Sequence, residues 1–209
     1  MFVSIGYEHN RSPLCFIVTV IADKALLGKS IMTGRGRIEV KLLIVVDMQN
    51  DFISGALGTA EAVRIVPAAA KKIAEYKARG DKIIFTRDTH GDDYLQILEG
   101  KLLPIAHCLL GTEGWRIADA LDTSGCRIID KNTFGSLELA EAAAQTDGLE
   151  CIELIGLCTD ICVISNAMIL KARLPETEII VDSACCAGLT PQSHQNALEA
   201  MRMCHIRIR

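Results

Sequence analysis

Short apolar runs alternate with amphipathic, alanine-rich segments along most of the chain, beginning at Val40. Runs of Leu, Ile and Val with few polar positions are typical of strands buried on both faces of a sheet. Between these runs the apolar positions follow helical spacing, and glycine or proline marks many of the ends. The pattern predicts strands at Lys41–Val46, Lys82–Thr86, Arg127–Asp130, Cys151–Ile155, Glu178–Val181 and His205–Ile208, and helices at Ala68–Arg79, Ser136–Gln145, Asp160–Ala172 and Pro191–Met203.

This alternation predicts right-handed βαβ units and therefore a three-layer α/β/α fold, with a mostly parallel sheet and helices on both faces. Pro67 is expected in the first turn of the first helix, where a missing N–H costs nothing. The segment between Asp88 and Cys126 has weak periodicity and several glycines, so we expect a functional loop region there.

The first 39 residues do not share the pattern. The apolar run Leu14–Ala22 has nine residues, and a bilayer span needs about 20. No small-residue cleavage site follows it, and Gly28–Arg37 has the composition of a basic linker. We expect residues 1–39 to be an extension without a catalytic role, or the product of a misassigned start, with Met32 or Val40 as the true one. Residues 40–209 are expected to be the working domain.

Composition narrows the function classes. Half of the 209 residues are hydrophobic and the formal net charge is −4, which excludes a disordered chain and disfavours a nucleic-acid partner. Nothing indicates a membrane protein. The nine cysteines follow no disulfide framework, so we expect free thiols in a reducing compartment, the cytoplasm.

Polar residues follow the predicted strands where each strand ends. Asp47 follows the first strand, Asp88 and His90 the second, Lys131 the third and Cys162 the fourth. In an open parallel sheet, ligands bind beyond the carboxyl ends of the strands. These side chains are therefore expected to meet at one edge of the sheet.

Cys162 is the strongest candidate nucleophile. The segment Ile155–Val163 is typical of strand, tight turn and helix start, with Thr159 or Asp160 as the N-cap. A thiol in the first helical turn is expected to have a lowered pKa and to lie near backbone amides that stabilise an oxyanion. The alternatives for Cys162 are a buried structural cysteine or a redox pair with Cys158. Cys158 itself is expected to be a turn residue or to line the pocket.

Asp47 and Lys131 suit a thiol mechanism, because a carboxylate can take the thiol proton and a lysine can hold that carboxylate in place. Taken singly, Asp47 is equally well explained as a strand-end turn residue and Lys131 as a solvated charge. Asp88, His90 and His107, with Glu99 as a fourth candidate, offer ligands suited to Zn, Fe or Mn. We assign no function to His9, His194 and His205, and a packing role to Trp115.

Five segments, in this order, resemble the isochorismatase-like cysteine hydrolases, especially the nicotinamidase branch. The resemblance runs from Val40 to the C-terminus. The segments are Val45–Phe52 (VVDMQNDF), Thr86–His90 (TRDTH), Pro104–Gly111 (PIAHCLLG), Lys131–Ser136 (KNTFGS) and Gly156–Val163 (GLCTDICV).

The resemblance implies that Asp47, Lys131 and Cys162 form a catalytic triad. Cys162 would attack the amide carbon, and Asp47 would protonate the departing ammonia and then activate water. The Leu157–Cys158 bond falls where the family has a cis peptide, and the amides of Cys158 and Cys162 would form the oxyanion hole.

In nicotinamidases a divalent metal holds the pyridine nitrogen. Its ligands would map onto Asp88, His90 and His107, with Glu99 matching a ligand of only part of the branch. Zn is the expected ion, with Fe or Mn as alternatives. Phe52 matches the aromatic that stacks on the ring. Leu103 lies where many nicotinamidases carry an aromatic residue. Loss of that aromatic would weaken stacking on the substrate ring by about 1 kcal/mol, so the resemblance also allows a different small amide as the substrate.

The function implied by the resemblance is hydrolysis of nicotinamide to nicotinate and ammonia, in pyridine-nucleotide salvage. Cys162 argues against vinyl-ether hydrolysis, because the isochorismatases proper lack that nucleophile. Two alternatives remain: a hydrolase of another small amide or carbamoyl compound, and a thiol redox or metal-binding module without turnover. Family members commonly form dimers or larger assemblies, so a homo-oligomer is also expected.

Overall fold

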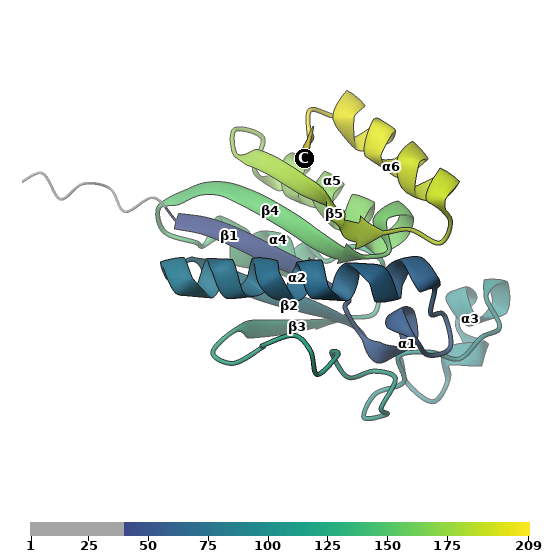
Figure 1. Ribbon diagram of the computed structural model, residues 1–209. Coiled ribbons are helices and arrows are strands. Elements are labelled where there is room, and N and C mark those ends of the chain that lie inside the picture. The colour runs from purple at the N-terminus through teal and green to yellow at the C-terminus, as the bar shows by residue number, and fades with distance from the viewer. Residues whose placement is uncertain (1–39) are drawn as a thin grey trace, which may run out of the picture. The chain divides into compact units, whose positions relative to one another are not determined.

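Six strands form one sheet in the order β3-β2-β1-β4-β5-β6, and every neighbouring pair is parallel. The computed structural model describes residues 40–209 (Figure 1). The strands are β1 Val40–Val46, β2 Lys82–Asp88, β3 Arg127–Lys131, β4 Leu149–Leu157, β5 Glu178–Ala187 and β6 Arg207–Ile208, and the helices are α1 Asn50–Ile53, α2 Ala60–Arg79, α3 Leu98–Leu102, α4 Leu137–Ala144, α5 Ile164–Arg173 and α6 Pro191–Met203, with a 3₁₀ turn at Tyr94–Gln96 and a π-helical turn at Thr159–Val163.

Helices cover both faces of the sheet, which confirms the predicted α/β/α layers. β1 is buried from Leu42 to Val46, as its unbroken apolar run predicts. One apolar cluster packs the sheet against α2 through residues such as Ile73, and the other packs it against α4, α5 and α6 through residues such as Leu170 and Met201. Figure 1 shows α2 crossing the near side of the sheet, with α4 and α5 behind it.

The first helix begins earlier than the proline signal predicts. α2 starts at Ala60, and the Thr59 hydroxyl caps it by accepting a hydrogen bond of 3.0 Å from the Ala62 amide. Placing Pro67 in the first turn was therefore wrong, since it is the eighth helical residue. The helix tolerates it because Pro67 and Val63 are both exposed, so the Val63 carbonyl that has lost its helical donor lies on the solvent-facing side of the helix.

Two further sequence predictions concern the first 39 residues and a membrane span. The expectations for residues 1–39, including the alternative starts, lie outside the described residues. Within residues 40–209, no helix is both long and apolar enough to cross a membrane.

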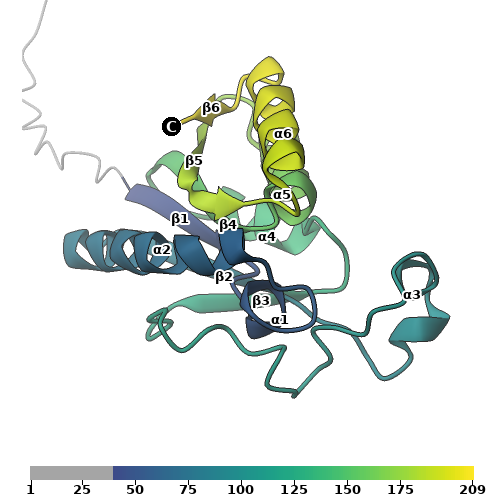
Figure 2. The same cartoon turned by 45° about the vertical axis from the view of Figure 1, so that its right-hand side comes forward.

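The strand order reverses between β1 and β4, which lie side by side although β2 and β3 separate them in sequence. Such a switch point opens a crevice at the carboxyl ends of the two strands. The strands approach closely there: Gly156 pairs with Val46 and has a φ of 120°, and a Cβ on it would lie 2.1 Å from the Val46 carbonyl oxygen. Figure 2 shows α1 and the α3 segment at this end of the sheet.

Candidate active site

Asp47, Lys131 and Cys162 come together in the crevice although they lie at or just beyond the ends of three different strands. The Lys131 Nζ lies 2.7 Å from Asp47 Oδ2 and 3.6 Å from Cys162 Sγ. All three side chains are buried. Because β3, β1 and β4 all end at this edge, the sheet itself sets these distances.

Asp47 is held by its own backbone and by the neighbouring strand. Its φ of 47° is in the left-handed region, so the chain turns sharply where β1 ends. The Thr86 hydroxyl donates to Asp47 Oδ1 at 2.6 Å, and the Asp47 amide donates to the same hydroxyl at 3.2 Å. Burial raises the pKa of Asp47, and the Lys131 charge opposes that rise. A carboxylate in this setting is a stronger proton acceptor than an exposed one.

The sequence prediction of a lowered thiol pKa was wrong. Burial and the neighbouring Asp47 charge raise the pKa of Cys162 well above its ordinary value, and the Lys131 charge only partly offsets them. Neither Thr159 nor Asp160 caps the helix, because Cys158 occupies the N-cap position and the turn through Cys162 is π-helical. Burial of the thiol therefore outweighs the effect of the helix dipole on the pKa of Cys162.

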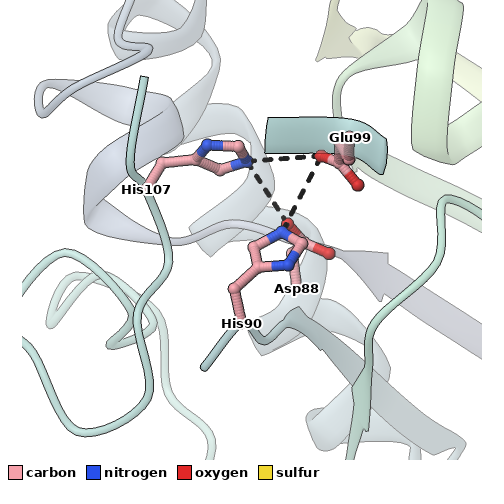
Figure 3. A group of neighbouring side chains, drawn as sticks. All are labelled: Asp88, His90, Glu99 and His107. Carbon is pink, nitrogen blue, oxygen red and sulfur yellow. Dashed lines mark hydrogen bonds and ion pairs between the residues drawn. The ribbon is translucent and has the colours of Figure 1, made fainter. Parts of the chain in front are cut away.

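A second group of side chains converges beside the first. Asp88, His90, Glu99 and His107 each point one ligand atom inward, and these four atoms lie within 4.8 Å of one another (Figure 3). His90 Nε2 is 2.8 Å from Asp88 Oδ2, while His107 Nε2 lies 3.6 Å from that oxygen and 3.7 Å from Glu99 Oε1. The His107 Nδ1 faces the Ile105 carbonyl at 2.8 Å, which leaves Nε2 free to bind.

Asp88 links the two groups. Its Oδ1 lies 3.4 Å from the Lys131 Nζ, and its Oδ2 faces the imidazoles. Burial alone raises the pKa of Asp88, but the hydrogen bonds from His107 and His90 and the Lys131 charge hold it well below its usual range. Burial and the Asp88 charge raise the pKa of Glu99.

A pocket of about 590 Å³ opens onto both groups. Cys162, Asp88, Glu99 and His107 line it, and so does Cys158. The rest of its wall is mostly apolar: Phe52, Leu57, Ile97, Leu98, Leu102, Leu103, Phe134, Ile161 and Leu189, beside Asn132 and Thr133.

Comparison with known proteins identifies the family. A profile of the isochorismatase family, described as "Isochorismatase domain", matches residues 41–208. The chain belongs to the isochorismatase family. The nicotinamidase/pyrazinamidase of Mycobacterium tuberculosis is 27% identical over 187 residues, covering 81% of this chain and 98% of that protein.

Solved structures of isochorismatase-fold proteins are similar to this chain. The pyrazinamidase of Pyrococcus horikoshii in complex with zinc has a TM-score of 0.71 at 27% identity, covering 81% of this chain and 98% of that one. The N-carbamoylsarcosine amidase of Thermoplasma acidophilum has a TM-score of 0.67 at 26% identity, covering 81% and 95%. The family resemblance and the fold predicted from the sequence are therefore confirmed.

In this family member the predicted site residues all lie at the crevice. The Leu157–Cys158 peptide bond is cis, as the resemblance implied. Phe52 lies with its ring centroid 5.5 Å from that of His107. Leu103 lines the pocket, and its carbonyl accepts a hydrogen bond of 2.9 Å from the Tyr94 hydroxyl.

Two residues at the site were not singled out from the sequence. The Gln49 side chain donates to the Asp88 backbone carbonyl at 2.8 Å and accepts from the Asp88 backbone amide at 2.7 Å. These two bonds fix the backbone from which the Asp88 carboxylate extends. The Tyr94 ring packs edge-on against His90 and His107, with centroids 4.8 and 5.0 Å away. Gln49 lies three residues after the end of β1, a signal that could have found it. Tyr94 sits in the aperiodic segment and carries no such signal.

Proposed function

We propose that this isochorismatase-family protein is a metal-assisted cysteine amidohydrolase that converts nicotinamide and water to nicotinate and ammonia. Its family and relatives make it a hydrolase of amide C–N bonds. The observation that carries the proposal is the contact of Lys131 with both Asp47 and Cys162, beside a pocket that also exposes Asp88, Glu99 and His107.

In the first half-reaction the Cys162 sulfur attacks the amide carbon. Because the thiol pKa is raised, Asp47 takes the thiol proton as the S–C bond forms. The backbone amides of Cys158 and Cys162 stabilise the oxyanion. When the C–N bond breaks, Asp47 returns its proton to the nitrogen, which leaves as ammonia, and a thioester to Cys162 remains.

In the second half-reaction a water molecule attacks the thioester carbon. Asp47 takes a proton from this water, and the same two amides stabilise the second oxyanion. The C–S bond then breaks, the proton on Asp47 passes to sulfur, and the product leaves as a carboxylic acid that loses its remaining proton to solvent. Lys131 stays protonated, since the Asp47, Cys162 and Asp88 charges outweigh burial and raise its pKa.

The donor set of Asp88, His90, Glu99 and His107 fits a divalent transition-metal ion such as Zn, because two imidazoles and two carboxylates suit it. The Lys131 ammonium contacts two carboxylates, those of Asp47 and Asp88, and Glu99 adds a third carboxylate beside Asp88. A divalent cation would neutralise the remaining negative charge. When bound it would hold the pyridine nitrogen and so orient the ring.

The pocket wall favours an apolar amide over a carbamoyl amino acid. Among the described residues that line it there is no lysine or arginine to pair with a substrate carboxylate. Phe52 offers a ring face, while Leu98 and Leu102 are more than two-thirds exposed at the rim. A second candidate substrate is therefore an amide with an apolar group larger than the pyridine ring, whose burial yields about 25 cal/mol per Å².

The test is ammonia release from nicotinamide, pyrazinamide, ring-alkylated nicotinamides and N-carbamoyl amino acids. We expect turnover of the aromatic amides, and its loss in Cys162→Ala. Cys151→Ala is the matched control, because Cys151 is also buried but lies near the start of β4, away from the site. No turnover of any amide, or turnover that survives Cys162→Ala, would overturn the proposal. A reversible Cys158–Cys162 disulfide without turnover would favour the redox alternative.

A further inference from the structure

Two contacts join the turn that carries Cys162 to α6 and to the loop just before it. The Thr159 Oγ1 and the His194 Nδ1 share a hydrogen bond of 2.8 Å. The Asp160 carboxylate accepts from the Leu189 amide, at 3.3 Å to Oδ1 and 3.2 Å to Oδ2. The first contact reaches α6 itself, which lies beside α5 in both ribbon views (Figures 1 and 2), and the second reaches the loop two residues before that helix.

The Thr159 hydroxyl depends on His194. Thr159 is fully buried, and His194 supplies the one hydrogen bond of its hydroxyl within the part of the chain that the structure describes. A buried hydroxyl that loses its partner costs about 1–3 kcal/mol. The turn is therefore expected to move, so that this hydroxyl finds water, when His194 is removed.

His194 itself stands on a fixed support. The Thr190 and Ser193 side chains form a reciprocal cap on α6, and Pro191 occupies the first turn. Gly188 lets the preceding loop pass close to His194, since a Cβ on Gly188 would lie 3.0 Å from the His194 Cα. The imidazole is thus presented from a capped helix rather than from a loose loop.

On the other side of the turn, its backbone is fixed by different groups. The Cys158 carbonyl accepts from the amides of Ile161 and Val163, at 3.1 and 3.0 Å. The Asn166 side chain donates to the Cys162 carbonyl at 2.8 Å. These bonds hold the two ends of the turn, and Thr159 is the residue between them that a neighbouring helix holds.

We propose that His194 is a positioning residue for the hydrolysis: through Thr159 it fixes the π-helical turn, and with it the direction of the Cys162 sulfur and of the two oxyanion amides. The inference rests on the proposed function for its kinetic consequence. Its geometric consequence, the placement of the Cys162 thiol, does not depend on any substrate. Displacements on the order of 1 Å at a reacting group cost up to about a hundredfold in rate.

Four variants test this role. His194→Leu and Thr159→Val each remove the hydrogen bond, and Thr159→Val does so with almost no change of shape. His194→Asn keeps it, because the asparagine amide reaches the position of the imidazole Nδ1. Gln195→Leu is the control, since Gln195 is the next residue of α6 and its exposed side chain bonds, within residues 40–209, only to Glu199.

Two readouts separate positioning from stability. The first is kcat and KM for ammonia release from nicotinamide. The second is the rate at which iodoacetamide alkylates Cys162, followed by mass spectrometry of its peptide, which needs no enzymatic turnover. Thermal unfolding shows that each variant folds, and Thr159→Val carries the test if His194→Leu does not fold.

We expect His194→Leu and Thr159→Val to lower kcat and the alkylation rate on the order of tenfold with KM nearly unchanged, the pattern of a lost transition-state geometry. His194→Asn and Gln195→Leu should stay near the wild type. The inference is overturned if Thr159→Val keeps both rates within about threefold of wild type, or if His194→Asn loses as much as His194→Leu. If the wild type hydrolyses no amide, the proposed function fails, while the alkylation rates still decide the positioning role.

Discussion

Replacing Lys131 by Met tests whether its ammonium holds the two buried carboxylates together. Lys131 Nζ lies 2.7 Å from Asp47 and 3.4 Å from Asp88, and its side chain is 2% exposed. Methionine keeps most of the volume and removes the charge. Two carboxylates would then face each other in the crevice without a cation.

The magnitude follows from these distances. At an effective dielectric constant of about 20, the contact with Asp47 is worth about 6 kcal/mol and that with Asp88 about 5 kcal/mol. Desolvation of the charges offsets several kcal/mol for each ion, so breaking a buried pair costs about 3–5 kcal/mol net. We predict that Lys131→Met lowers the free energy of unfolding at pH 7 by that amount.

Urea unfolding with a chelator present measures this loss without a contribution from bound metal. Trp115 is the only tryptophan of the chain and reports the transition by fluorescence. Lys77→Met is the matched control, because Lys77 Nζ also lies 2.7 Å from a carboxylate, Asp122, but at the surface. That pair should contribute less than about 1 kcal/mol.

The double variant with Asp47→Asn sharpens the test. If the ion pair is responsible, the loss caused by Lys131→Met should be smaller when Asp47 is already neutral, and the coupling should amount to about 2 kcal/mol or more. The difference between wild type and Lys131→Met should also narrow in acid, because protonation of Asp47 leaves only the Asp88 charge, which His90 still contacts. A loss no larger than that of Lys77→Met, with no coupling, would refute the reasoning.

Three further predictions concern proton transfer, metal and backbone. Because burial raises the pKa of Asp47, kcat/KM for nicotinamide should fall in acid as the pH drops through a value above the ordinary carboxyl range of about 3.9; a pH–rate profile with its acid limb at or below that range contradicts this. His107→Ala should weaken Zn²⁺ binding, measured by chelator competition, by at least about tenfold, whereas His205→Ala should not. Gly156→Ala should lower the free energy of unfolding in urea by more than about 3 kcal/mol, since the φ of Gly156 is 120° and a Cβ there would meet backbone atoms. Gly80→Ala, at a helix end where a Cβ has open space, should lower it by only about 1 kcal/mol. Equal losses in the two variants would contradict the steric argument.

The sheet could be predicted wherever burial is purely apolar. β1 is buried on both faces, and its sequence is an unbroken apolar run. β5 extends to Ala187, six residues beyond the predicted end at Val181, because Asp182 and Ser183 interrupt the apolar run. Asp182 is tolerated in the strand because Lys72 of α2 pairs with it at 2.7 Å. A partner 110 residues away leaves no local signal.

Glu99 and His107 carry no strand-end signal, because they lie in the segment between β2 and β3. The other polar candidates could be predicted to lie together because the carboxyl ends of parallel strands meet; these are Asp47, Asp88, His90, Lys131 and Cys162. Their electrostatics could not. The dipole of a following helix is a local feature of the sequence, whereas the burial of Cys162 and the charge of Asp47 depend on the whole fold. Likewise Thr159 and Asp160 are good capping residues by type, yet their side chains bond to His194 and Leu189, which lie about thirty residues further along the chain.

Burial alone does not single out a nucleophile among the described cysteines. It also raises the pKa of Cys108 and Cys186, and it raises that of Cys158 to about 12. Cys162 differs in having the Lys131 ammonium 3.6 Å from its sulfur, and the Asp47 carboxylate behind that ammonium. A thiol with a raised pKa is protected at rest and becomes nucleophilic only when its proton has an acceptor at hand. Its neighbours, supplied from the ends of β1 and β3, are therefore what distinguish Cys162 as the proposed nucleophile among the described cysteines.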